Sequence, residues 1–178
     1  MTTARIRKAT RDDIPAAQEL KLACWREVYA DLRDEEFFRR AEARLDEDIA
    51  WWQRGIDAGA EFHVAELEGT FGPQIIGIAG ATPTLPEDAD AGVGIEMGML
   101  YVLQKHDAPA APGAGAPGLR ALLLETVLQG REALVWVIEQ DQTTLNFYRD
   151  HGFTPDGARE SLDGEWAGLS EIRLVRRP

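Results

Sequence analysis

The chain has 178 residues, of which 44% are hydrophobic and 28% charged, a length and composition that suit one folded domain with its own core. Its 31 Asp and Glu exceed its 19 Lys and Arg, and the formal charge of -12 argues against binding nucleic acid or anionic membrane through a basic surface. The single cysteine, Cys24, excludes an intramolecular disulfide and indicates a reducing cytoplasm, and three scattered histidines lack the spacing of metal ligands.

The first half of the chain predicts a strand, two long helices and two further strands. ARIRKAT, from residue 4, alternates as a strand does. TRDDIPAAQELKLACWREVYADL repeats apolar residues at three- and four-residue steps, and Thr10 or Asp12 can cap this helix. EEFFRRAEARLDEDIAWWQRGIDAG is expected to form one second helix that ends near Gly59. EFHVAELEG and PQIIGIAGATP, bounded by Gly and Pro, predict a pair of strands.

Strands and helices alternate in the second half. GIEMGMLYVL, after the acidic loop LPEDADAG, predicts a strand, and ALVWVIE predicts a central strand covered on both faces. DQTTLNFYRDHGF predicts a short helix capped by Asp141 and ended by Gly152, and the tail predicts a hairpin around Asp163 and Gly164. GLRALLLETVLQG predicts a helix ended by Gly130, whose apolar face comprises Leu119, Leu122, Leu123 and Val127.

Three segments in this order, GIEMGMLYV, the glycine-rich loop with its helix, and TLNFYRDHGF, resemble the GNAT superfamily of acyl-CoA-dependent N-acyltransferases. The sharpest match is the pattern of Phe147, Tyr148, Gly152 and Phe153, and the resemblance covers essentially the whole chain. It implies one α/β domain over residues 1–178, with a mixed, mostly antiparallel sheet whose central parallel strands splay apart between flanking helices. It also implies acetyl-CoA as co-substrate, no metal, and direct attack by a primary amine.

Two side chains are the catalytic candidates. Glu96 interrupts an apolar strand where similar enzymes carry a glutamate, and a carboxylate near the acceptor could remove the proton of the attacking amine. An apolar cleft would raise the pKa of Glu96 towards the working pH. Tyr148 is the tyrosine that in similar enzymes protonates the departing thiolate. We therefore expect Glu96 as general base and Tyr148 as general acid.

The resemblance assigns most of the cofactor contacts to backbone. The amides of Leu100, Tyr101 and Val102 would bond the pantetheine arm and the thioester carbonyl. Because the backbone makes these contacts, the identity of the side chains is a poor test of them. Phe147 is a further cofactor contact. Asp141 stands where related sequences commonly have Asn, which keeps the helix cap but brings a negative charge towards a polyanionic ligand.

The segment KHDAPAAPGAGAPG departs from the family pattern, in which Gly-x-Gly directly opens a helix that holds pyrophosphate. Three interpretations stay open. Gly113 and Gly115 wrap the pyrophosphate while the extra residues bulge outward. Alternatively, the amides of Leu119 to Ala121 and the Arg120 guanidinium hold it, with Gly118 as the first glycine of the pair. In the third interpretation the site is damaged and the segment is a connector.

The acceptor is expected to bind near the first two helices, where Trp25 and Tyr29 stand among acidic residues, a combination suited to a cationic amine of a small molecule or peptide. Neither nucleic acid nor membrane is an expected partner, and homodimers are common among similar proteins. The irregular loop and Asp141 also leave open a rival interpretation, a catalytically impaired protein of this fold that binds a ligand or partner.

Overall fold

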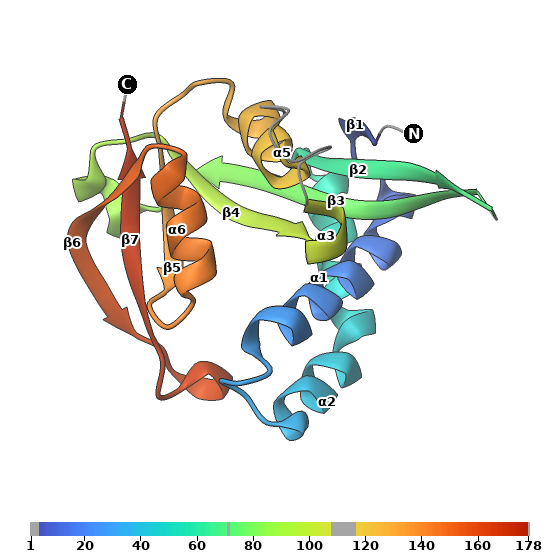
Figure 1. Ribbon diagram of the computed structural model, residues 1–178, viewed down its shortest axis with the longest axis horizontal. Helices are drawn as coiled ribbons and strands as arrows, with labels where there is room; N and C mark the ends of the chain where they lie inside the picture. The colour runs from blue at the N-terminus through green and yellow to red at the C-terminus, as the bar shows by residue number, and fades with distance from the viewer. Residues whose placement is uncertain (1–3, 71, 108–116, 178) are drawn as a thin grey trace. The chain divides into compact units, whose positions relative to one another are not determined.

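The computed structural model describes residues 4–70, 72–107 and 117–177 (Figure 1). Two compact units divide the chain: unit 1 comprises Met1–Gly80 and Met99–Val127, and unit 2 comprises Ala81–Gly98 and Leu128–Pro178. Strands β3 (Gly72–Pro83) and β4 (Ile95–Val102) have residues in both units.

Unit 1 is built on an antiparallel strand pairing that the alternating sequence predicts. Strand β1 (Arg5–Lys8) pairs with β2 (Phe62–Gly69), with Ile6 opposite Ala65. Strand β2 pairs in turn with β3, with Val64 opposite Ile78. Both pairs confirm the strands expected at ARIRKAT, EFHVAELEG and PQIIGIAGATP.

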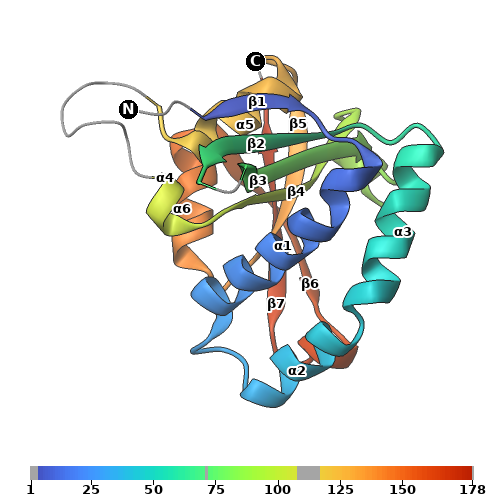
Figure 2. The same cartoon turned by 90° about the vertical axis from the view of Figure 1, so that its right-hand side faces the viewer.

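The helices of unit 1 follow β1. A short 3-10 turn, η1 (Arg11–Asp13), leads into α1 (Ile14–Tyr29), which contacts both α2 (Glu35–Ala43) and α3 (Leu45–Asp57) (Figure 2). The prediction of one long second helix was wrong, because Arg44, with φ -96° and ψ 3°, separates α2 from α3. The charges fit the break, since Arg40 lies in the last turn of α2 and three acidic residues open α3, and each of these charges matches the dipole of its helix end.

The apolar faces of α1 and α3 cover one face of the sheet in unit 1. Ile14, Ala17, Leu20 and Cys24 pack with Trp52, Phe62, Val64 and Ile78. The adjacent Trp51 is 64% exposed, so only one of the two tryptophans joins the core, because neighbouring residues of a helix point to different faces.

Helix α5 (Leu119–Leu128) covers the opposite face of this sheet. A Cβ added to Gly77 would lie 2.8 Å from the Leu123 side chain, so the glycine allows α5 to approach β3 closely. The expected apolar face was wrong at one position, because Leu122 is exposed while the neighbouring Leu124 is fully buried. Helix α4 (Gln104–Asp107), directly after β4, was not predicted.

Unit 2 is built around β5 (Ala133–Ile138), which pairs in parallel with β4 and antiparallel with β7 (Ser170–Arg176). Helix α6 (Gln142–Asp150) packs against β5 and β6 (Phe153–Ser161) (Figure 1). The acidic loop contains a 3-10 helix, η2 (Pro86–Ala91), and a third, η3 (Gly164–Trp166), lies between β6 and β7. The expected hairpin therefore has longer strands and a wider turn than its two turn residues suggested.

The seven strands are hydrogen-bonded in the order β1-β2-β3-β4-β5-β7-β6. Glu96 of β4 lies opposite Leu134 of β5 in the parallel pair, whereas β1 with β2, β2 with β3, β5 with β7 and β6 with β7 are antiparallel. This confirms the predicted α/β fold with a mixed, mostly antiparallel sheet. The predicted splaying of the central strands stays a prediction.

Candidate functional site

Glu96 lies within unit 2, on the part of β4 that pairs with β5. Its Oε2 is buried and has no hydrogen-bond partner among the described residues. Burial raises the pKa of Glu96, the negative charge of Asp88 raises it further, and a backbone hydrogen bond from Leu85 opposes them. A carboxylate with a raised pKa and an unused oxygen is suited to accepting a proton.

The same face of the sheet in unit 2 holds a buried ion cluster. Because residues in register share a face, Glu96 lies on the side of Trp136 and Arg173. Arg173 is 4% exposed and its guanidinium donates to Asp88 at 2.7 Å, and also to Asp90 and Asp156. The Trp136 indole donates to the second oxygen of Asp88 at 3.0 Å. Asp88 is therefore paired with Arg173 and Trp136, whereas Oε2 of Glu96 has no hydrogen-bond partner among the described residues.

Tyr148 lies on α6 in unit 2 and is 5% exposed. Its ring packs edge-on against the rings of Phe147 and Phe153, each with its centroid 5.2 Å away. Phe147 also contacts the His151 ring at 4.4 Å. The Tyr148 ring is thus packed between aromatic neighbours, and its role as general acid stays a prediction.

Asp141 serves as the cap of α6. Its Oδ1 accepts a hydrogen bond from the Thr144 amide at 2.9 Å, as the sequence predicted. The side chain is buried, with the residue 6% exposed. The cofactor contact of Asp141 stays a prediction.

The end of β4 brings predicted cofactor and acceptor residues together in unit 1. The Trp25 indole nitrogen lies 3.4 Å from the Tyr101 hydroxyl, and burial raises the pKa of Tyr101. Val102 is buried and Leu100 is partly exposed, while Tyr29 is the last residue of α1. Trp25 and Tyr101 are thus neighbours, which the sequence alone did not indicate.

A carboxylate of the chain itself binds at the start of α5, which the sequence did not predict. The Asp107 carboxylate accepts from the Arg120 amide at 2.8 Å and from the Arg120 Nε at 2.9 Å. Gly118 and Leu119 belong to the same turn, whereas Gly113 and Gly115 lie outside the described residues. Sequence reasoning missed Asp107 because no local pattern links it to a residue thirteen positions later.

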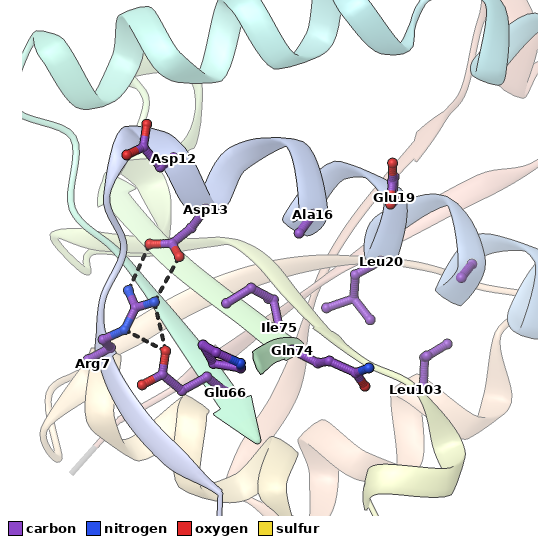
Figure 3. A pocket seen from close by; sticks show the side chains of 12 residues that line it. Arg7, Asp12, Asp13, Ala16, Glu19, Leu20, Glu66, Gln74, Ile75 and Leu103 are labelled. Carbon is purple, nitrogen blue, oxygen red and sulfur yellow. Dashed lines mark hydrogen bonds and ion pairs between the residues drawn. The ribbon is translucent and has the colours of Figure 1, made fainter. Parts of the chain in front are cut away.

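A pocket in unit 1 has a cavity volume of about 550 Å³ and was also not predicted (Figure 3). Arg7 points between Asp13 and Glu66 and bonds both, with distances of 2.7 and 2.8 Å to Asp13 and 2.8 Å to Glu66 (Figure 3). The Arg7 guanidinium lowers the pKa of Asp13 to about 2. Aliphatic side chains and two further carboxylates complete the lining, which includes Asp12, Glu19, Leu20, Ile75 and Leu103. None of the predicted site residues lines it.

Within residues 4–70, 72–107 and 117–177, no group of three or more His, Cys, Asp or Glu side chains is arranged to hold a metal ion. In the same ranges, no helix has both the length and the apolar character needed to cross a membrane.

Neither a family model nor a curated protein matches this sequence. Solved structures do match it along nearly its whole length. The PaiA N-acetyltransferase from Thermoplasma acidophilum, in complex with coenzyme A, is 17% identical, with a TM-score of 0.64 over 99% of each chain.

Two further structures show the same likeness. A GNAT-family acetyltransferase from Bacillus cereus is 15% identical, with a TM-score of 0.58 over 98% of this chain and 97% of the other. The ribosomal-protein-alanine N-acetyltransferase from Brucella melitensis is 22% identical, with a TM-score of 0.58 over 97% and 98%. At these identities the likeness establishes the fold, so the chain has the GNAT acetyltransferase fold that its sequence predicted.

Proposed function

We propose that this chain, acting as one domain, is an N-acetyltransferase that moves an acetyl group from acetyl-CoA to a primary amine by direct attack. The observation that carries the proposal is Glu96, a carboxylate with a raised pKa and an unpartnered buried oxygen on a central strand of this fold. A binding module would have no chemical need for such a group. The likeness to a structure solved with coenzyme A supports the cofactor class.

The residues divide the proton transfers between them. Glu96 takes a proton from the acceptor ammonium and so frees the amine to attack the thioester. The Val102 amide donates to the thioester oxygen as negative charge grows on it. Tyr148 donates its phenolic proton to the sulfur that departs, and the phenolate regains a proton as the nitrogen of the new amide loses one.

A covalent acyl-cysteine has no support in this chain. Cys24 is 5% exposed in the core of unit 1, and burial raises the pKa of its thiol to about 12. The thiol therefore stays protonated at neutral pH and is a poor nucleophile. Direct attack by the amine is the simpler route.

The cofactor and acceptor classes follow from charge. The first turn of α5 already binds a carboxylate through an amide and a guanidinium, so it is chemically suited to phosphate. The formal charge of -12 favours a cationic acceptor, a small molecule or a peptide.

Thermal unfolding with acetyl-CoA tests the cofactor class directly. A ligand at 100 times its dissociation constant should stabilise the fold by about 2.7 kcal/mol, which raises the melting temperature by several degrees. Coenzyme A and desulfo-coenzyme A should act alike, and ATP should not. A melting temperature unchanged by millimolar coenzyme A would instead favour the rival interpretation, a partner-binding protein.

Glu96→Gln tests the base through both stability and rate. Because burial raises the folded-state pKa of Glu96 above its unfolded-state value, Glu96 destabilises the fold progressively as the pH rises above the unfolded-state pKa, and fully above the folded-state pKa. The variant should therefore melt at a higher temperature than wild type at pH 7, and this difference should vanish below about pH 4. Its turnover should fall most at low pH, where the acceptor is protonated.

Glu68→Gln is the control for this experiment, because Glu68 is an exposed carboxylate on β2. It should match wild type in melting temperature and turnover at every pH. A Glu96→Gln rate profile that coincides with wild type would remove Glu96 from the mechanism.

A further inference from the structure

Helix α4 is held at both of its ends by carboxylate contacts within unit 1. At its start, the Gln104 amide donates to the Glu27 side chain at 3.0 Å. At its end, Asp107 binds the amide and the Nε of Arg120. Figure 2 shows α4 directly after β4. These contacts fix the Asp107 carboxylate against the first turn of α5.

The Asp107 contact is a strong one. The two side chains are 16% and 17% exposed, and both carboxylate oxygens accept a bond from the same residue, Arg120. Bonds of this charge-assisted, two-point kind are about twice as strong as neutral ones. Helix α5 has ten residues, so its free amides also carry the positive end of a helix dipole.

The absence of a side chain at Gly118 allows this contact. A Cβ added there would lie 2.7 Å from the Asp107 carbonyl oxygen and 3.0 Å from its Oδ1. Both distances are too short for a side chain, so glycine is needed for Asp107 to lie where it does. Two residues, Gly118 and Arg120, thus accommodate one carboxylate.

We propose that Asp107 is a built-in competitor for the anionic part of the acyl donor: it occupies the Arg120 amide and guanidinium, and phosphate oxygens bind there only when it leaves. This inference rests on the proposed function, because it assumes a phosphate-bearing donor at α5. While the tethered carboxylate is bound, the site is closed to an external anion. The apparent affinity for that anion is therefore its intrinsic affinity multiplied by the fraction of time that the site is free. Asp107 therefore sets the affinity for the donor.

Asp107→Asn tests the competition, since it keeps the shape of the side chain and removes its charge. The substitution weakens the charged hydrogen bonds between residue 107 and Arg120, which compete with the ligand. Their loss should therefore lower the dissociation constant of coenzyme A by about tenfold. Inorganic pyrophosphate should show the same gain, since the competition concerns the anion. Asp107→Ala, which removes the group entirely, should bind at least as tightly as Asp107→Asn.

The matched control is Glu27→Gln, which removes the carboxylate at the other end of α4 and leaves the start of α5 unchanged. Its dissociation constants, measured by calorimetry, should equal those of wild type. Melting temperatures of all variants establish that each is folded.

The outcomes separate this inference from the proposed function. If wild type binds coenzyme A and both Asp107 variants bind it equally or more weakly, Asp107 positions Arg120 and the competition is refuted. If only the Asp107 variants bind coenzyme A, the competition is supported in its strongest form. If no protein binds coenzyme A, the proposed function fails, and the inference fails with it.

Discussion

Tyr148→Phe is expected to lower the turnover number by about 100-fold, the lower range for loss of a positioned general acid. The variant keeps the ring that packs against Phe147 and Phe153, so the fold and the melting temperature should be unaffected. The dissociation constant of coenzyme A should change less than twofold, because the phenol acts on the sulfur only as it departs. Steady-state kinetics with acetyl-CoA, together with calorimetry, separate the two effects.

Tyr101→Phe is the matched control for this substitution. Like Tyr148→Phe, it removes one phenolic oxygen. Tyr101 lies on β4 in unit 1, where its hydroxyl is 3.4 Å from the Trp25 indole nitrogen and burial raises its pKa. In the proposed mechanism Tyr101 contributes only backbone, so its turnover should stay near that of wild type. Equal losses in the two variants, or an unchanged rate in Tyr148→Phe, would exclude Tyr148 as the specific acid.

Arg173→Met is expected to destabilise the protein by about 3–5 kcal/mol, since removing one member of a buried ion cluster leaves another charge buried without its partner. Asp88 is 5% exposed and, among the described side chains, would keep the Trp136 indole as its hydrogen-bond donor. For a chain of this length, that loss corresponds to a melting temperature lower by roughly 10 °C. Urea unfolding of the variant and the wild type measures it.

Arg159→Met provides the comparison within the same unit. Arg159 pairs with Glu139 at 2.8 Å, but their side chains are 54% and 41% exposed. An exposed ion pair contributes about 0–1 kcal/mol, so this variant should unfold close to wild type. A similar, small loss in both arginine variants would contradict the stabilising role assigned to Arg173.

The sequence by itself determined the elements that have a local cause. Alternating apolar residues predicted β1, β2 and β3, and the three-to-four-residue period predicted α1 and α5. The cap at Asp141 and the left-handed Gly152, with φ 84°, are also where the sequence placed them. Glu96 could be singled out because a charge within an apolar strand is itself a local signal.

The tertiary structure alone decided everything that depends on residues far apart in the chain. The carboxylates that hold Arg173 come from Asp88, Asp90 and Asp156, and no periodicity connects these positions. The same holds for Asp107, which meets Arg120 only because β4 and α5 bring them together in unit 1. Side-chain spacing encodes which face of an element is apolar, but the partner of a buried charge is set by the packing of distant segments. For that reason the sequence predicted the fold and the candidate base, and the structure was needed to find the groups that surround the candidate site.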